Sequence, residues 1–354
     1  MVSLFNQEPA SHARELILLN SAVLHAMNNS PKAARVHVPH HRVQRFWRWF
    51  PALTVLALLF YATVGYLGSA SMIGENPRWR GMNRGPRDFG LNGETVSFRS
   101  QDGVALKAWW LPADGNPRGT VIIAHGIDHT RQVMLPRASF LVHGGYNVLA
   151  VDLRGHGESA AQYVGGGYLE ARDILGAIHY VREREELAPI ALLGVSMGAA
   201  ASMLAAANSR EVAAVVADGV YPSGRDVSDN ISRHYVYDRG AKLWMRGLFL
   251  VALCPGVVRA TMLVYYARTG IYLGPDFVSV LPSASRIRVP VLFISGERDW
   301  IVPTEQAREV MAALPTDRKS LVVIPNAAHD TTYSAAPSLY GNAVLSFLNN
   351  NLPK

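Results

Sequence analysis

Residues 189–208 read PIALLGVSMGAAASMLAAAN. They run from a short apolar stretch, typical of a buried strand, into an alanine-rich stretch, typical of a closely packed helix. Ser196 stands at the junction, with Gly194 and Gly198 two residues to either side. A serine held in a strained turn of this kind needs both glycines, because side chains there would collide with the neighbouring strand and helix. The pattern favours a nucleophilic Ser196; the alternative is a small residue at the start of a packed helix.

The rest of the chain from residue 92 onward repeats this alternation of strand and helix. Residues 94–113 predict two strands around the hairpin signal Gln101–Gly103. Six later apolar stretches, each followed by a helical pattern, predict further strands within 119–126, 146–157, 189–196, 212–219, 289–299 and 320–329. Strands that are apolar throughout and alternate with helices are typical of a parallel sheet covered on both faces. The predicted fold class is therefore α/β, with a mostly parallel sheet.

Two loops beyond the carboxyl ends of later strands carry candidate partners for Ser196. Asp299 follows the strand 289–294, and His329 follows the strand 321–324. The order Ser, Asp, His along the chain predicts that His329 takes the serine proton and that Asp299 orients the imidazole. Each residue has an ordinary alternative, since an Asp after a strand often caps a helix. Asp218, at the end of the strand within 212–219, is the rival acid. Asp330, next to His329, is expected to point away from the site.

An oxyanion hole needs two backbone N–H groups beside the nucleophile. Met197 supplies one at the start of the helix after Ser196, where the helix dipole also helps. In the stretch IIAHGIDH, Gly126 lets the chain turn sharply and Ile127 presents the second N–H. His125 is then a structural residue of this loop rather than a base.

Five motifs together resemble the α/β-hydrolase superfamily: AHGIDH, DLRGHGES, GVSMGA, GERDWIVP and PNAAHD. More narrowly, they are similar to membrane-anchored serine hydrolases akin to serine aminopeptidases, monoacylglycerol lipases and dienelactone hydrolase-like esterases. The resemblance covers about residues 92–350 and implies the α/β-hydrolase fold. It also implies a structural loop beside the site, built from Asp152, Arg154, Gly155 and His156.

The N-terminal part has its own organisation. Residues 49–74 contain no charged side chain and are long enough to cross a bilayer, so they predict a transmembrane signal anchor after a tail over 1–48. A buried core helix and a cleaved signal peptide, with small residues in Leu67–Ser71, remain alternatives. Five basic residues precede the span closely and four follow it: Lys32, Arg35, Arg42, Arg45 and Arg48 before, Arg78, Arg80, Arg84 and Arg87 after. This difference favours a cytoplasmic N-terminus and a periplasmic or otherwise extracytoplasmic catalytic domain.

A linker is expected over 75–91 and the hydrolase domain over 92–354. Within that domain, about residues 220–288 replace a short connection and turn from polar to apolar. A loop of this length needs its own structure, so we expect a helical cap. The segment LFLVALCPGVV within it is too short for a second span and is broken by Pro255.

Composition excludes several function classes. The formal net charge is +7, but no run of five basic residues and no nucleic-acid motif occurs, so no nucleic-acid partner is expected. The lone cysteine, Cys254, allows neither an intrachain disulfide nor a thiolate cluster. No H-E-x-x-H pattern occurs, and neither a metal nor a cofactor is predicted.

The leading hypothesis is a serine hydrolase that cleaves small-molecule or lipid esters with apolar acyl groups through an acyl-enzyme on Ser196. A peptidase or amidase with the same triad, and a non-catalytic membrane-tethered protein on a hydrolase fold, remain alternatives. The sequence leaves open the substrate, the oligomeric state and the side of the membrane that the catalytic domain faces.

Overall fold

The computed structural model describes residues 40–73, 81–161, 163–237, 240–254 and 256–353. The predicted tail up to residue 39 and the first part of the predicted linker, 74–80, lie outside the described residues. Contacts between residues divide the chain into two units, 1–57 and 58–354, and each is described by itself.

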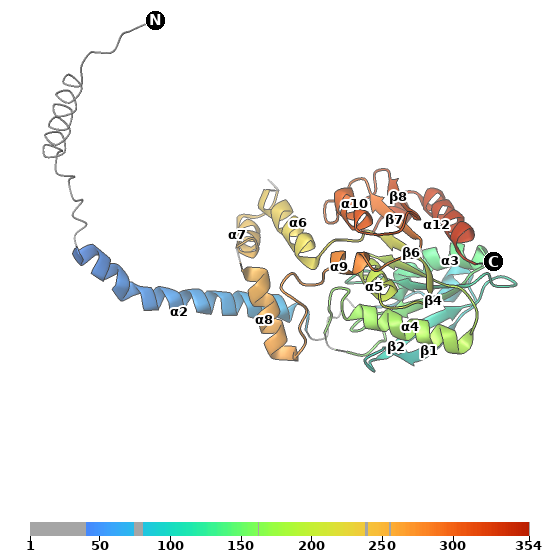
Figure 1. The fold of residues 1–354 in the computed structure, drawn as a ribbon, viewed down its shortest axis with the longest axis horizontal. Coiled ribbons are helices and arrows are strands. Elements are labelled where there is room, and N and C mark those ends of the chain that lie inside the picture. The colour runs from blue at the N-terminus through green and yellow to red at the C-terminus, as the bar shows by residue number, and fades with distance from the viewer. Residues whose placement is uncertain (1–39, 74–80, 162, 238–239, 255, 354) are drawn as a thin grey trace, which may run out of the picture. The chain divides into compact units, whose positions relative to one another are not determined.

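The second unit is built on one eight-stranded sheet (Figure 1). Its strand order is β1-β2-β4-β3-β5-β6-β7-β8. β2 pairs antiparallel with both β1 and β4, and every pair from β4 to β8 is parallel. The strands are β1 (Glu94–Arg99), β2 (Ala105–Leu111), β3 (Thr120–Ala124), β4 (Asn147–Asp152), β5 (Ile190–Val195), β6 (Val212–Asp218), β7 (Val291–Gly296) and β8 (Lys319–Ile324).

The central strands are buried on both faces, which explains why they are apolar throughout. In β3, Ile122 and Ala124 belong to one hydrophobic cluster, whereas Val121 and Ile123 belong to the other. Because side chains along a strand point alternately to the two faces, such a strand must be apolar at every position. The predicted parallel sheet with helices on both faces is confirmed.

Helices cover the two faces in separate layers. On one face lie α4 (Glu170–Arg184), α5 (Met197–Ala206) and α10 (Thr304–Ala312), whose apolar residues join the first cluster (Figure 1). On the other face lie α3 (Leu135–His143) and α12 (Pro337–Asn351), which join the second. The short 3₁₀ helix η3 (Arg131–Met134) precedes α3, and α11 (Thr332–Ala335) precedes α12. This layering leaves the carboxyl edge of the sheet to the loops.

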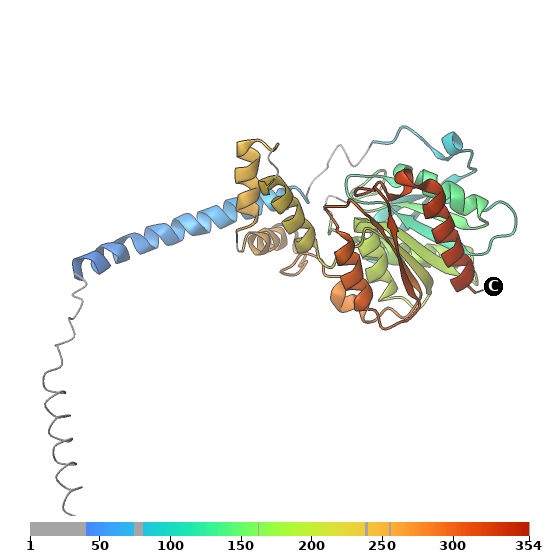
Figure 2. The same cartoon turned by 90° about the horizontal axis from the view of Figure 1, so that it is seen from above.

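The long connection after β6 forms helices. It contains α6 (Gly224–Tyr237), α7 (Leu243–Ala252), α8 (Val257–Thr269) and the short α9 (Leu281–Ala284). In both views α6, α7 and α8 lie beyond one end of the sheet, apart from the helices that cover its faces (Figures 1 and 2). We call α6, α7 and α8 the cap.

The helix α2 (His40–Ala70) contains one stretch, Trp49–Ala70, that is long and apolar enough to cross a membrane. Only 6% of its most apolar window is buried. A core helix of a soluble protein would instead bury most of that window, so the core-helix alternative does not fit the described residues. The helix ends four residues before the predicted end of the span at residue 74.

The described part of the predicted linker is not all extended chain. Pro86–Phe89 forms the 3₁₀ helix η2, and Leu91 is buried in the second hydrophobic cluster. Met82 and Phe89 pack against the same cluster. The segment therefore fastens the start of β1 to the domain.

Candidate active site

Ser196 sits in the tight turn between β5 and α5. Its backbone has φ 53° and ψ −114°, a conformation that L-residues avoid. A Cβ on Gly194 would lie 2.1 Å from the carbonyl oxygen of Gly198, and one on Gly198 would lie 2.4 Å from that of Ala124. The two glycines are thus needed for steric reasons, as the sequence pattern predicted.

The imidazole of His329 faces the Ser196 hydroxyl. The distance from Ser196 Oγ to His329 Nε2 is 2.9 Å, and His329 Nδ1 lies 2.7 Å from Asp299 Oδ2. The structure therefore brings Ser196 together with Asp299 and His329, which lie 103 and 133 positions later in the chain, in the loops beyond the carboxyl ends of β5, β7 and β8. Ser196 and Asp299 are buried, and 13% of the His329 side chain is exposed.

Backbone donors fix the carboxylate of Asp299. Its Oδ1 accepts the N–H groups of Ile301, at 3.0 Å, and Val302, at 2.8 Å, which leaves Oδ2 for the imidazole. The residue that caps α10 is Pro303, so Asp299 is not the helix cap that its position also allowed.

Asp218, the rival acid, has other partners. Its Oδ2 accepts hydrogen bonds from Thr332 Oγ1 at 2.7 Å, Tyr340 OH at 3.1 Å and Arg137 Nη2 at 3.2 Å. Burial raises the pKa of this carboxyl despite these three donors. Its oxygens join β6 to α3, α11 and α12, which is a structural role.

The charges around His329 favour its protonated form. Burial alone would lower its pKa, but the hydrogen bond to Asp299 and the negative charges of Asp330, Asp299 and Asp218 outweigh burial and raise the pKa above its ordinary value. An imidazole that gains a proton during a reaction is stabilised by the same charges.

Asp330 does not point away from the site, contrary to the prediction. Its Oδ1 lies 3.6 Å from His329 Nε2, and its Oδ2 lies 3.5 Å from His129 Nε2 on the loop after β3. Burial opposes ionisation of Asp330, but the hydrogen bond from His129 and the charge of His329 lower its pKa. The backbone φ of Asp330 is 59°, so the chain does not alternate as an extended strand would, and both side chains turn to one side.

The loop after β3 lies directly against Ser196. A Cβ on Gly126 would be 3.3 Å from Ser196 Cβ, which leaves little room for a larger residue there. Two hydrogen bonds of His125 fix this loop. Its Nε2 accepts the N–H of Leu153 at 3.1 Å, and its Nδ1 donates to the carbonyl of Gly126 at 2.7 Å. Burial, together with His156, keeps the pKa of His125 well below its ordinary value, so this ring is neutral.

Two backbone N–H groups beside the serine have no protein acceptor among the described residues. They are those of Met197, at the start of α5, and of Ile127, after Gly126. Both N–H groups belong to the turns next to Ser196 and stay available to an acceptor, as an oxyanion hole requires.

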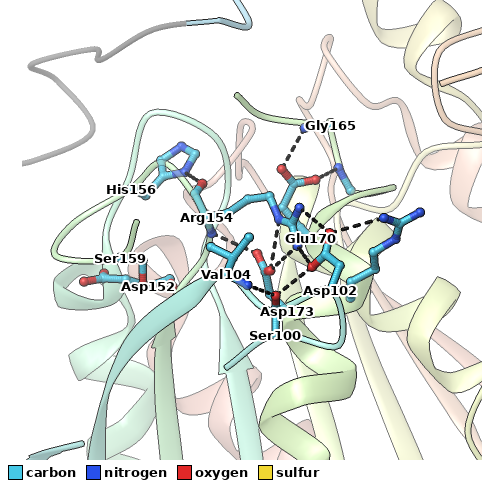
Figure 3. Close-up of polar contacts among 12 residues, drawn as sticks. Ser100, Asp102, Val104, Asp152, Arg154, His156, Ser159, Gly165, Glu170 and Asp173 are labelled. Atoms are coloured by element: carbon cyan, nitrogen blue, oxygen red, sulfur yellow. Dashed lines mark hydrogen bonds and ion pairs between the residues drawn. The ribbon is translucent and has the colours of Figure 1, made fainter. Parts of the chain in front are cut away.

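Residues of the loop after β4 take part in a buried network of ion pairs and hydrogen bonds (Figure 3). Arg154, 1% exposed at its side chain, donates to Asp173 Oδ1 from Nε and Nη2 and to Asp102 from both terminal nitrogens. Burial raises the pKa of Asp173 to about 7 even though Arg154 opposes that shift. Glu170 accepts the N–H groups of Gly165 and Gly167. Asp152 in turn binds Arg131. These contacts give the loop the structural role that the resemblance implied.

The described residues contain no group of three or more His, Cys, Asp or Glu side chains placed to hold a metal ion. A hollow of about 500 Å³ opens between α6 and the loop of Asp299, lined by Asn230, Arg233, His234, Tyr237 and Trp300. Trp300 stacks on His234 with ring centroids 3.8 Å apart, so α6 rests on the residue next to Asp299.

Sequence comparison places this chain among known families. A family model described as serine aminopeptidase, S33, matches residues 115–221 and 268–334. The unmatched gap, 222–267, contains α6, α7 and most of α8. The Escherichia coli (strain K12) protein YfhR is 25% identical over 251 residues, which cover 68% of this chain and 75% of that protein. The Schizosaccharomyces pombe protein bem46 is 23% identical over 253 residues, 70% of this chain and 74% of that protein.

Solved structures show the same fold. An esterase of Pyrococcus furiosus, Pf2001, superposes with a TM-score of 0.63 and 25% identity, and covers 79% of this chain and 100% of its own. A dienelactone hydrolase from Anabaena variabilis superposes with a TM-score of 0.52 at 20% identity, over 74% of this chain and 99% of its own.

Proposed function

This chain belongs to the α/β-hydrolase superfamily, and from that premise we propose that it is a serine hydrolase that cleaves carboxylic esters with apolar acyl groups. One observation carries the proposal. A buried serine in a strained turn lies 2.9 Å from an imidazole nitrogen whose partner nitrogen lies 2.7 Å from a buried carboxylate. This arrangement suits acyl transfer.

The proposed reaction runs in two halves. Ser196 Oγ attacks the carbonyl carbon of the ester while His329 Nε2 takes the hydroxyl proton. The negative oxygen of the tetrahedral intermediate accepts the N–H groups of Met197 and Ile127. The intermediate then breaks its bond to the alkoxide, which leaves with the proton from Nε2, and the acyl group stays on Ser196.

Water completes the cycle. His329 Nε2 removes a proton from water, the hydroxide attacks the acyl carbon, and Ser196 leaves with that proton while the carboxylic acid is released. Asp299 keeps Nδ1 protonated throughout, because its Oδ1 is held by two backbone N–H groups and its Oδ2 remains free to accept. Each oxyanion donor contributes roughly 3 kcal/mol of transition-state stabilisation in related cases.

The cap supports the apolar acyl preference, and one relative supports an ester as the substrate. Residues 243–274 are largely apolar, and the structural relative from Pyrococcus furiosus is named an esterase. The test is a series of p-nitrophenyl esters of increasing acyl length, measured with wild type and with Ser196→Ala. We expect hydrolysis that rises with chain length in the wild type and is lost in the variant. Equal hydrolysis by both proteins would overturn the role of Ser196.

A second candidate reaction uses the same three residues on an amide. The observation that favours it is the family model, which is described as a serine aminopeptidase. Aminoacyl p-nitroanilides, assayed beside the esters, separate the two: a kcat/KM higher for the anilides would replace the esterase proposal with a peptidase one. A folded protein inactive on both would favour the non-catalytic alternative.

We also propose that α2 anchors the enzyme in a membrane. The stretch Trp49–Ala70 has a mean hydropathy of 1.8, and at 22 residues it is long enough for the hydrocarbon core of a bilayer. The number of basic residues close to it, five before and four after, supports a cytoplasmic N-terminus and a catalytic domain on the opposite side.

A further inference from the structure

The cap helices α7 and α8 expose an unusual amount of apolar surface. No residue of α7 is buried, and three residues of α8 are. The exposed large side chains are Leu243, Trp244, Leu248 and Leu250 on α7 and Leu263 and Tyr266 on α8. A water-facing helix normally presents polar residues on its outer side, so this surface needs a covering partner.

The C-terminal half of α2 packs closely on α8 within the second unit. A Cβ on Gly65 would lie 2.8 Å from the carbonyl oxygen of Ala260, and one on Gly68 would lie 2.8 Å from Thr261 Oγ1. Such contacts through glycine let two helix backbones approach as helices do in membranes. Arg268 fastens the end of α8 by donating to Ser69 Oγ at 3.0 Å. The apolar surface of the cap is therefore continuous with that of Leu58–Ala70.

The charges of this segment identify the kind of partner. Residues 240–275 contain four basic side chains, Lys242, Arg246, Arg259 and Arg268, and no Asp or Glu. Lys242 precedes α7, Arg246 and Arg259 lie in the first turns of α7 and α8, and Arg268 lies in the last turn of α8. Apolar helices with cations at or near their ends suit the boundary between acyl chains and anionic phospholipid headgroups. A second copy of the same surface would instead bring like charges together.

We propose that α7 and α8 enter one leaflet of the bilayer that Trp49–Ala70 would cross, as a bent helical pair. The 10 residues of α7 reach about 15 Å, half of the roughly 30 Å of hydrocarbon, so α7 does not span it alone. The two helices together meet the length and hydropathy criteria of a membrane segment, with a bend of 75°. The proposal keeps the sequence-based expectation that LFLVALCPGVV, residues 248–258, does not cross the bilayer. It adds that this segment contacts one leaflet.

An extension that rests on the proposed function is that lipid-like esters approach Ser196 from the membrane, beside the cap. Phe249 of α7 stacks on Tyr235 of α6 with centroids 4.5 Å apart, and the neighbouring His234 stacks on Trp300, the residue after Asp299. The helix that would lie in the membrane is thus fastened to the loop that carries the acid. Substrate would enter beside the cap without crossing bulk water.

The sole cysteine of the chain tests the membrane contact directly. Cys254 lies between α7 and α8, so it can carry an environment-sensitive nitrobenzoxadiazole label in the full-length protein. In phosphatidylcholine–phosphatidylglycerol vesicles we expect quenching by nitroxide-labelled lipid and protection from aqueous iodide. The matched control is Cys254→Ser with Leu187→Cys, a position 92% exposed, where we expect the reverse.

Quenching of the Cys254 label by iodide to the same extent as the control would overturn the proposal. Protection from both quenchers would overturn it too, since the surface would then be covered by protein, including a second copy. Neither quenching measurement depends on catalysis, so failure of the membrane contact can be told apart from failure of the proposed esterase activity.

Substrate access is tested with the double variant Leu248→Asp, Leu250→Asp. Both side chains are exposed, so folding should be unaffected, and Leu187→Asp serves as control. We expect unchanged kcat/KM on a water-soluble short-chain ester and a loss of about tenfold or more on a long-chain ester presented in vesicles. Equal losses on both substrates, or on neither, would contradict entry from the membrane. Lack of soluble-ester hydrolysis by the wild type itself would contradict the proposed function instead.

Discussion

Two buried aspartates lie at the same edge of the sheet, Asp218 at the end of β6 and Asp299 in the loop after β7, and their partners distinguish them. Asp299 contacts His329, whereas Asp218 accepts from Arg137, Thr332 and Tyr340. Asp299 thus belongs to the proposed acid–imidazole pair, and Asp218 to the packing of α12 and α3 on the sheet. Substitution by the isosteric amide tests this assignment.

Asp299→Asn should lower kcat by roughly 10³- to 10⁴-fold, because an amide no longer favours the required tautomer of His329. Its melting temperature should stay near that of wild type. Asp218→Asn should leave the folded enzyme active but cost about 3–5 kcal/mol of unfolding free energy, since it leaves the buried Arg137 charge without a carboxylate. Ester kinetics and thermal unfolding measure both. The opposite pattern would make Asp218 the acid.

Asp330 gives a prediction about pH. His329 acts as a base only when neutral, so kcat/KM rises as pH passes upward through its pKa. The nearby carboxylate raises that pKa, and Asp330→Asn removes this effect. The acid limb of the profile should therefore move to lower pH in the variant. His129, Asp299 and Asp218 also face this group and stay unchanged. A profile that does not move would mean that Asp330 only holds the loop of His129.

Ser196, Asp299 and His329 could be predicted from the sequence because each follows a recognisable apolar strand, and the carboxyl ends of parallel strands share one edge. It could not place Asp330, because the left-handed turn at that residue depends on contacts with the loop after β3. Nor could it find the partners of Asp218, since Arg137 and Tyr340 lie 81 and 122 positions away.

Among the elements, the loop after β4 depends on one buried guanidinium. Arg154 binds Asp173 and Asp102 with its side chain nearly fully buried (Figure 3). Arg172 binds Asp102 from a side chain that is 40% exposed. We expect Arg154→Met to lower the free energy of unfolding by about 3–5 kcal/mol, because it leaves the carboxylates of Asp173 and Asp102 without this cation. The control Arg172→Met should cost less than about 1 kcal/mol. Urea unfolding of both variants measures the difference, and equal costs would mean that burial does not set the strength of this network.

At this scale, periodicity predicted all eight strands, because the apolar positions of β3 to β7 are fixed by burial on two faces. It gave the cap only as helical. The helices α6, α7 and α8 lie outside the sheet, and few of their residues are buried: two in α6, none in α7 and three in α8. Burial therefore imposes only a weak apolar period on their sequence.

For the whole molecule, the proposed anchor would decide where the hydrolase works. The full-length chain should stay with membranes after alkaline carbonate extraction, because Trp49–Ala70 is held by apolar burial rather than by charge. A tag at the N-terminus should be protected from protease added to the extracytoplasmic side, whereas the hydrolase domain should be cleaved. Release by carbonate would contradict the anchor, and cleavage of the tag would reverse the orientation.

The central claim is an acyl-enzyme on Ser196, which a fluorophosphonate probe tests most directly. The full-length protein is labelled, digested and mapped by mass spectrometry, beside Ser196→Ala and His329→Ala. We predict one adduct, on the peptide that contains Ser196, with strongly slowed labelling in the histidine variant because the hydroxyl loses its base. Labelling of Ser196→Ala at the wild-type rate, or an adduct on another residue of the wild type, would contradict the account.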